Sequence, residues 1–453
     1  MNTYKLPALE SCNIAIIGLG YVGLPLAIEF AKNKISYSSK KKLNYKVTGF
    51  DVNKERIENL NKSFDENQEI NLKEFNFYKD LKFTYKEEDL YNNDIFIISV
   101  PTPIDKDKKP DLTYIKKATE TVAKALLSTK KSKSKKNNFS KIIIYESTVY
   151  PGTTEEECIP LIEQVSKLKN NVDFVVGYSP ERINPGYNQI PLTKIKKVVS
   201  GSDMFITNFI GDLYSSIIQE GVFKANSIKV AEAAKVVENT QRDVNIAFVN
   251  QISVIMEKLG INTNDVLEAA STKWNFLKFK PGLVGGHCIG VDPYYLIYKS
   301  NQMGYDPDLL TAAREINSYM PIHIKDIIHK YFNNGNFISD NIKILILGFS
   351  FKENCSDFRN TLVEPLYKSL LNLSYSVDIY DDYVDREKVK EIFGIELKEK
   401  FNDEIKYDMV ILAVPHKAFL DFDTNKWDSL LSKNGVIFDL KSELSYKKRV
   451  LKL

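Results

Sequence analysis

The chain has 453 residues, of which 43% are hydrophobic and 27% charged, and its 62 basic and 59 acidic residues give a formal net charge of +3. This length predicts two or three domains, and the near balance of charge gives no reason to expect nucleic acid or a membrane surface as a partner. No run of about 18 uncharged apolar residues occurs, so no transmembrane helix is expected, and the first residues lack a signal-peptide core.

The first third of the chain alternates short apolar runs with helical patterns. Residues 13–17 and 47–51 are predicted strands, with a helix at 24–32 and a polar, lysine-rich surface insertion at 33–46 between them. Further strands are expected at 95–100, 141–145 and 174–177. Strands that alternate with helices predict a doubly wound α/β domain with a parallel sheet.

A glycine-rich turn joins the first predicted strand to the first predicted helix. Gly18, Gly20 and Gly23 fit the G-x-G-x-x-G pattern, with Tyr21 and Val22 completing the turn. In this pattern the glycines allow a tight turn, close approach of a pyrophosphate and close helix packing. We therefore expect a dinucleotide site built from these five residues.

An acidic residue, Asp51, ends the second predicted strand. A carboxylate at this place binds a ribose 2′-hydroxyl and repels a 2′-phosphate, which favours NAD over NADP. Arg56, one helical turn later, could contact the adenosine or a phosphate, although an isolated arginine is more often solvated.

Three more predicted strands end in turns that carry polar side chains. Thr102 follows the strand at 95–100, Ser147 and Thr148 follow the strand at 141–145, and Glu181 follows the strand at 174–177. Ligands of open α/β sheets bind at the carboxyl ends of strands, whereas proline-rich turns are also ordinary structural features.

Residues 227–260 form one amphipathic stretch without proline, which predicts a helix of about 30 residues followed by more helix through Ala270. Its apolar face needs a partner, so we expect this middle region to form a dimer. Lys235 and Asn239 are four residues apart and share one helix face, where a cation and an amide would suit a developing oxyanion. A solvated lysine beside a helical asparagine is the plain structural alternative.

Cys288 lies in the run Val284–Tyr295, after Gly285 and Gly286 and four residues before Asp292. Two glycines leave access to the sulfur, and a carboxylate follows nearby, which is the setting of a nucleophile rather than of a packed thiol. His287 is adjacent, but neighbours in sequence generally point in different directions, so it is not expected to be the base.

The remaining cysteines support no pairing pattern. The spacing of Cys12, Cys158, Cys288 and Cys355 argues against a disulfide framework and against a zinc site, so no metal is expected. Such usage is typical of a reducing cytoplasm.

The last part of the chain restarts the strand signal at 341–348, 376–381, 409–413 and 436–440. Gly348 stands where a first glycine would, but the later glycines of the fingerprint are missing. The prediction is a second Rossmann-like domain, which binds the nucleotide half of a substrate or is purely structural. The expected domains are residues 1–212 for the cofactor, 213–325 for the central helices and 326–453 for this second α/β domain.

Together these motifs resemble the UDP-glucose/GDP-mannose dehydrogenase family, the nucleotide-sugar 6-dehydrogenases, from about residue 13 to residue 440. The resemblance implies oxidation of a sugar C6 alcohol to a carboxylate in two NAD-linked steps, with Cys288 as the nucleophile. It implies an oxyanion role for Lys235 and Asn239, and water activation by Asp292. Thr148 and Glu181 match the remaining water-handling and acid/base positions.

The resemblance also implies a set of contact residues. Lys352 matches a substrate-contacting lysine, and Arg359 matches a cofactor-contacting arginine. The other residues expected to contact substrate are Glu181, Arg182, Lys235, Asn239, Phe279, Gly282 and Gly285.

The substrate is narrowed by two departures from the UDP-glucose enzymes. Those enzymes carry a Pro-Glu-Phe-Leu type segment where this chain has residues 180–186, and an arginine where this chain has Thr272. The chain resembles the branch that oxidises UDP-N-acetylhexosamines, UDP-GlcNAc or UDP-GalNAc, for bacterial surface polysaccharides. UDP-ManNAc and UDP-glucose remain alternatives, and so does a non-catalytic nucleotide-sugar-binding protein.

Overall fold

The computed structural model describes residues 4–66, 79–131, 139–183, 190–286, 288–334, 342–401, 404–444 and 448–453. Within the chain, Met1–Glu238 with Tyr294–Met303 forms one compact unit, and Asn239–Pro293 with Gly304–Leu453 forms a second. Each unit is described by itself. The residues His287, Asn341 and 184–186, which figured in the sequence analysis, lie outside this description.

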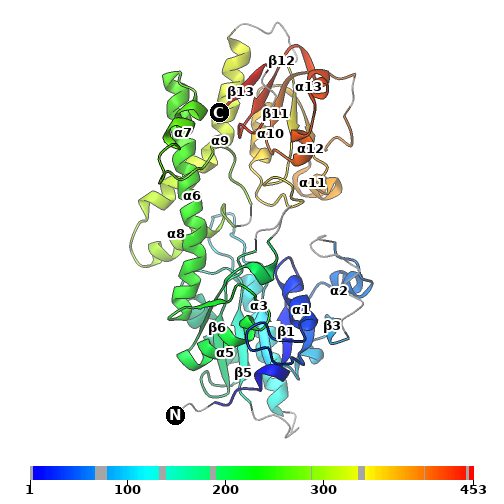
Figure 1. Ribbon diagram of the computed structural model, residues 1–453, viewed down its shortest axis with the longest axis vertical. Helices are drawn as coiled ribbons and strands as arrows, with labels where there is room; N and C mark the ends of the chain where they lie inside the picture. Colours follow the sequence, from blue (N-terminus) through cyan, green and yellow to red (C-terminus); the bar gives the residue numbers. More distant parts are fainter. Residues whose placement is uncertain are drawn as a thin grey trace. The chain divides into compact units, whose positions relative to one another are not determined.

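The first unit contains an eight-stranded sheet in the order β3-β2-β1-β4-β5-β6-β7-β8 (Figure 1). The strands are β1 (Asn13–Ile17), β2 (Lys46–Phe50), β3 (Leu81–Thr84), β4 (Ile95–Ile98), β5 (Lys141–Tyr145), β6 (Phe174–Tyr178), β7 (Lys197–Gly201) and β8 (Val222–Lys224). Its helices are α1 (Gly23–Lys32), α2 (Lys54–Asn61), α3 (Thr113–Lys131), α4 (Ile159–Ser166) and α5 (Met204–Ser215). The order 3-2-1-4-5-6 is that of dinucleotide-binding folds.

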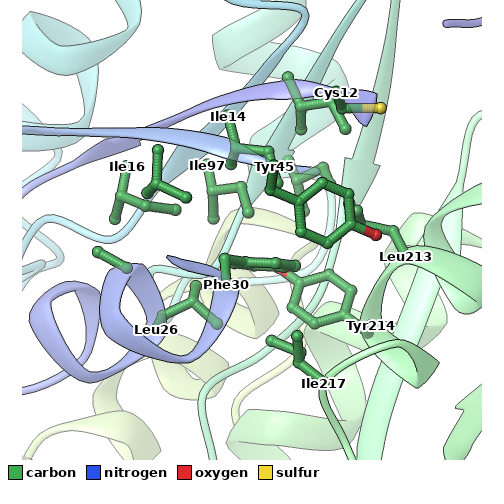
Figure 2. Close-up of a cluster of buried hydrophobic side chains, with 14 of the residues drawn as sticks. Cys12, Ile14, Ile16, Leu26, Phe30, Tyr45, Ile97, Leu213, Tyr214 and Ile217 are labelled. Carbon is green, nitrogen blue, oxygen red and sulfur yellow. The ribbon is translucent and has the colours of Figure 1, made fainter. Parts of the chain in front are cut away.

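Alternate residues of these strands feed two cores on opposite faces of the sheet. Ile14, Ile16 and Ile97 pack with side chains of α1 and α5, and Figure 2 shows Phe30 and Tyr214 in this cluster. Ala15 and Ile17 face the other way, toward α3 and α4. Because both faces are covered, the strands read as continuous apolar runs, and the prediction of a doubly wound α/β fold is confirmed.

The insertion at 33–46 is only partly the surface segment that its composition predicted. All five of its lysines are exposed, but Leu43 and Tyr45 are buried. Tyr45 packs edge-on against Phe30 and its hydroxyl lies 3.1 Å from Ser216 Oγ, so the end of the insertion joins the core (Figure 2).

Two strands of the first sheet, β7 and β8, run against the other six, because β8 pairs in parallel with β7. Strands β1 to β6 pair in parallel, whereas β7 pairs with β6 antiparallel, with Gly177 opposite Gly201 and Tyr178 opposite Ser200. The amino end of β7 therefore lies at the edge of the sheet where β5 and β6 end.

The predicted long helix is α6 (Ile228–Leu259), 32 residues, and its course includes the boundary between the two units. The other helices after it are α7 (Thr263–Ala270), α8 (Asp292–Gln302), α9 (Asp308–Asn333), α10 (Val363–Leu371), α11 (Arg386–Phe393), α12 (Lys417–Leu420) and α13 (Thr424–Leu430).

The second unit has a parallel five-stranded sheet in the order β10-β9-β11-β12-β13. The strands are β9 (Lys343–Leu347), β10 (Ser376–Tyr380), β11 (Tyr407–Leu412), β12 (Leu431–Asp439) and β13 (Val450–Lys452). One face packs on side chains of α9, α10 and α11, and the other on side chains of α12 and α13 (Figure 1). The second Rossmann-like sheet is thus confirmed. Among the described residues, no helix is both long and apolar enough to cross a membrane.

Candidate active site

The glycine-rich turn after β1 has the backbone shape that a bound pyrophosphate requires. The Gly18 N–H donates to the Phe50 carbonyl at 2.8 Å, and Gly18 has a φ of +92°. A Cβ on Gly23 would lie 1.9 Å from the Gly18 carbonyl oxygen and 2.4 Å from Ser99 Oγ. A Cβ on Gly20 would meet no described atom within 4 Å. Gly18 and Gly23 are therefore fixed by the protein itself, whereas the space at Gly20 is open to a ligand.

Asp51 lies beside this turn. One of its oxygens accepts the Leu19 N–H at 2.8 Å, and the other accepts the Asn53 N–H at 2.9 Å. The carboxylate is only half-buried, so each oxygen keeps a lone pair for a further donor such as a ribose hydroxyl. Tyr21 and Val22 precede α1, where the first free N–H groups of the helix favour an anion. The residues present fit NAD.

Arg56 supports this turn from inside the protein. Its Nε and Nη2 donate to the Leu19 carbonyl at 3.1 and 3.0 Å, and its Nη1 pairs with Asp65 at 2.6 Å. The side chain is buried, which is unusual for an arginine unless it is paired. A direct contact of Arg56 with the cofactor stays a prediction.

The turns after β4 and β5 are hydrogen-bonded to each other. Thr102 Oγ1 donates to the Thr148 carbonyl and Ser147 Oγ donates to the Val100 carbonyl, both at 2.6 Å. The Tyr295 hydroxyl donates to the Thr102 carbonyl at 2.5 Å. The Ser147 and Thr102 hydroxyls thus brace the backbone, while the Thr148 side chain is half-buried at the carboxyl edge of the sheet.

Glu181 is a buried carboxylate three residues beyond β6. Its Oε1 accepts the backbone N–H groups of Arg182, at 2.6 Å, and of Ile183. Its Oε2 forms no hydrogen bond with the described residues and lies 3.5 Å from Lys197 Nζ. The Arg182 guanidinium donates to Glu238 at 3.0 Å and so binds the loop to α6.

Lys235 and Asn239 are both buried on α6. No hydrogen bond or ion pair of the Lys235 ammonium occurs with the described residues of its own unit. A buried cation without an anion is costly, which is typical of a site completed by a ligand.

In the second unit, Asn239, Asp292 and Cys288 belong to one small constellation. Asn239 Nδ2 donates to Asp292 Oδ2 at 2.5 Å, and both side chains are buried. The Cys288 carbonyl accepts the N–H groups of Val291 and Asp292 at 3.0 and 2.8 Å. The half-buried thiol therefore belongs to the turn that directly precedes α8.

The glycines before Cys288 have a packing reason that the sequence did not reveal. A Cβ on Gly285 would lie 2.5 Å from the Asn360 carbonyl oxygen, and one on Gly286 would lie 2.6 Å from the Phe351 ring. Gly286 also has a φ of +94°. The segment is thus pressed against the loop that follows β9, and access to the sulfur is not the first reason for these glycines.

The other residues expected to contact ligands are spread over the second unit. Lys352 lies 5.7 Å from the Phe351 ring centroid, and Arg359 forms a fork with Asp357, Nε to Oδ1 at 2.9 Å. Gly282 is held at both its N–H and its carbonyl by the Asn250 amide.

Phe279 lines a different feature, a surface groove of about 210 Å³ beside Phe248 and Leu277. None of the residues that line this groove belongs to the glycine segment before Cys288.

Sequence reasoning did not single out Lys441, which lies beside the glycine segment before Cys288. Lys441 lines a small cavity together with Leu283, Gly285 and Phe351, and its Nζ lies 3.4 Å from Glu353 Oε2. Only its place after a strand end could have indicated it.

The predicted site residues thus form two described sets. The first unit brings together the glycine turn, Asp51, Thr102, Ser147 and Thr148 at one edge of its sheet, with Lys235 and Glu181 in the same unit. The second unit holds Asn239, Asp292, Cys288 and the segment before it. Within the described residues no cluster of His, Cys, Asp and Glu could hold a metal, and no disulfide joins any of the four cysteines.

Three family models match the chain in succession. The NAD binding domain of the UDP-glucose/GDP-mannose dehydrogenase family matches residues 12–218, its central domain 229–319, and its UDP binding domain 345–445. The UDP-N-acetyl-D-glucosamine 6-dehydrogenase of Salmonella typhi is 46% identical, with 96% of each chain covered. The protein of that name from Pseudomonas aeruginosa is 43% identical, with 98% and 100% covered. A solved UDP-D-ManNAc dehydrogenase from Pyrococcus horikoshii superposes with a TM-score of 0.80 at 29% identity, covering 97% and 98%.

Proposed function

The chain belongs to the UDP-glucose/GDP-mannose dehydrogenase family, and from this premise we propose that it oxidises C6 of a UDP-N-acetylhexosamine to the uronate. UDP-GlcNAc or UDP-GalNAc is the proposed substrate. The observation that carries the choice is the 43–46% identity, over nearly full length, to two UDP-N-acetyl-D-glucosamine 6-dehydrogenases. NAD is the cofactor of this family's first domain and supplies the hydride acceptor in each of two steps.

The first step removes a hydride from C6 and a proton from its oxygen. Lys235 is the proposed partner of the developing alkoxide, because a buried cation without an anion of its own stabilises negative charge strongly. Glu181, with one carboxylate oxygen free of hydrogen bonds, is the proposed proton acceptor. Thr148 is proposed to order the water that shares this edge.

The second step needs a tetrahedral adduct, because an aldehyde cannot lose a hydride to give an acid directly. The Cys288 thiolate adds to the C6 carbonyl, and the resulting thiohemiacetal loses a second hydride to become a thioester. Asp292, oriented by Asn239, takes a proton from the water that cleaves the thioester. In sum, one alcohol, one water and two NAD⁺ give one carboxylate, two NADH and three protons.

The experiment that tests this function is a count of NADH per sugar. Purified protein is incubated with NAD and, in turn, UDP-GlcNAc, UDP-GalNAc, UDP-ManNAc and UDP-glucose, and the product is identified by mass. Two NADH and a uronate from an N-acetylated sugar are expected. One NADH with an aldehyde, or no turnover with any sugar, would contradict the roles of Cys288 and Asp292. Cys288→Ser should abolish acid formation.

A second candidate is UDP-ManNAc as the substrate. A UDP-N-acetyl-D-mannosamine dehydrogenase of Pyrococcus horikoshii is 31% identical over 92% of both chains. The lower identity places this candidate second, and the same panel of sugars separates the two. A non-catalytic nucleotide-sugar-binding protein is disfavoured, because it has no need for Lys235, Asn239, Asp292 and Cys288 together.

Three further parts of the proposal concern organisation. The division at 1–212, 213–325 and 326–453 assigns NAD to the first part, Lys235 and Cys288 to the second and the UDP-sugar to the third. A homodimer is proposed because α6 exposes Phe248, Ile255 and Leu259. A cytoplasmic location is proposed because a reactive thiol needs a reducing compartment.

The uronate on its nucleotide is a glycosyl donor, and we propose that transferases of surface polysaccharide synthesis consume it.

A further inference from the structure

A buried lysine stands behind the carboxylate of Glu181. Lys197 is the first residue of β7, and it is only 1% exposed. Because β7 is antiparallel to β6, its first residue lies at the edge where the parallel strands end. A lysine at this depth is rare unless anions surround it.

The ammonium of Lys197 is shared between two carboxylates. Its Nζ donates to Glu146 Oε2 at 2.7 Å and lies 3.5 Å from Glu181 Oε2. The Tyr214 hydroxyl of α5 donates to the other oxygen of Glu146, and the Tyr214 ring lies 5.3 Å from Nζ. Although burial by itself would lower the pKa of Lys197, Glu146 and Glu181 raise it above its usual value, so the side chain is a cation.

The two carboxylates differ in how fully they are satisfied. Glu146 receives a donor on each oxygen and is fully buried, so it anchors the lysine. Glu181 has donors on one oxygen, whereas its other oxygen lies near Lys197 and has no hydrogen-bond partner among the described residues. The next residue, Arg182, pairs with Glu238 of α6.

We propose that Lys197 is a positioning residue of the reaction, held by Glu146 and Tyr214, whose ammonium holds the Glu181 carboxylate in place with Oε2 free to accept a proton. The proposal rests on the acid/base role of Glu181 in the proposed function. Glu146 also directly precedes Ser147 and Thr148, so the same ion pair fixes the turn after β5.

The test removes the ion pair as a whole, because loss of one partner leaves a buried charge unpaired. Glu146→Gln/Lys197→Met is compared with Lys141→Met/Asp94→Asn. This control removes another largely buried lysine–carboxylate pair, 3.2 Å apart, at the opposite end of β5. Measured are kcat, KM for the UDP-sugar and the pH profile of kcat/KM.

The first variant should lose roughly 100-fold in kcat, the size of a general-base effect, with KM nearly unchanged. The acid limb of its pH profile should move to higher pH, because the variant removes the cation beside the reacting carboxylate. The control should keep the wild-type kcat and acid limb. A folded Glu146→Gln/Lys197→Met protein with wild-type kcat and acid limb would show that Lys197 is merely structural.

A variant with one substitution tests the proposal even if the double variant does not fold. Glu146→Gln leaves the cation with Glu181 as its one carboxylate partner in the cluster, so the acid limb should move the opposite way, to lower pH. An unmoved or upward limb in this variant would refute the proposal.

Failure of the proposed function is detected separately. The ionisation of Glu181 is followed by infrared titration of its carboxylate band, identified with Glu181→Gln, in protein without sugar. The band of the ionised form should persist to lower pH in the wild type than in Glu146→Gln/Lys197→Met. If no sugar is oxidised, the proposed function is refuted. If the Glu181 band titrates alike in the wild type and in Glu146→Gln/Lys197→Met, the role of Lys197 is refuted.

Discussion

Gly20 and Gly23 offer a pair of matched substitutions, because the space around the Gly20 Cα is open and the space around the Gly23 Cα is filled by protein atoms. A Cβ at Gly23 would lie 1.9 Å from the Gly18 carbonyl oxygen, which is backbone and cannot move aside without displacing α1 from β1. A Cβ at Gly20 would meet no described atom within 4 Å. Gly23→Ala should therefore damage the fold, whereas Gly20→Ala should damage only the approach of the pyrophosphate.

The magnitudes follow from the contacts. Overpacking of this kind costs about 1–3 kcal/mol, and the backbone contact places Gly23→Ala in the upper half of that range. At roughly 2–4 °C per kcal/mol for a domain of this size, the melting temperature of the first unit should fall by roughly 4–12 °C. Gly20→Ala should melt as the wild type does without NAD, and its Kd for NAD should rise by at least about tenfold, or about 1.4 kcal/mol.

The assay is differential scanning calorimetry without NAD, with NAD affinity measured by titration calorimetry on the same samples. If Gly20→Ala bound NAD as tightly as the wild type, Gly20 would not mark the place of the pyrophosphate. If Gly23→Ala melted at the wild-type temperature, the packing of the turn described above would be wrong.

Three further outcomes are expected. Asp292→Asn removes the carboxylate that Asn239 orients, so the thioester should accumulate. The accumulated thioester should be visible as a covalent sugar adduct in the mass of the intact protein. A variant with normal turnover and no adduct would count against this role of Asp292. Burial raises the pKa of Glu232 from 4.5 to about 7. The protonated side chain therefore stabilises the fold by about 3 kcal/mol below about pH 4.5, and this contribution is lost as the pH rises through 7. Glu232→Gln should therefore lose less melting temperature than the wild type between pH 5 and pH 8, and parallel losses would contradict the reasoning. Phe248→Glu places a charge on the exposed face of α6 and should convert the proposed dimer to monomer in light scattering, whereas an unchanged mass would exclude that face.

The elements that the sequence predicted well are those whose signal is local. The strand at 13–17 and the strand at 141–145 have their predicted bounds, and the long helix agrees within one residue at each end. Each gives its signal within its own residues, as a continuous apolar run in the strands and as a helical period in the helix. The edge strands β3, β8 and β13 were not predicted, because they are only three or four residues long.

The interactions that the sequence could not reveal join residues far apart in the chain. Strand β7 begins with Lys197, and a lysine at a strand start reads as exposed until its partner Glu146, 51 residues earlier, is known. Arg56 reads as solvated until Leu19 and Asp65 enclose it. Buried charge is decided by three-dimensional partners, which periodicity does not contain.

The two sheets repeat one local device. Gly18 and Gly348 each end the first strand of their sheet with a φ of +92°. Asp51 and Asp381, at the end of the neighbouring strand, each accept the N–H of the residue after that glycine, at 2.8 and 2.6 Å. Each aspartate also accepts the N–H of the residue two positions after itself, which is Asn53 for Asp51 and Tyr383 for Asp381. The second unit therefore keeps the carboxylate of a dinucleotide fingerprint as well as its first glycine.

What differs is the access to that carboxylate. Asp51 is half-buried, whereas Asp381 is fully buried, and His416 Nε2 lies 3.1 Å from Asp381 Oδ2 with the Tyr383 ring stacked on the imidazole. Burial alone would raise the pKa of Asp381, but His416 and the backbone donors hold it below its usual value, so the carboxylate stays ionised and occupied. We therefore expect a ribose hydroxyl to bind the first carboxylate and not the second. The proposed role of the turn in the first unit is to bind a dinucleotide, whereas in the second unit the turn braces the protein. We expect the UDP binding domain to hold its nucleotide through groups other than Asp381.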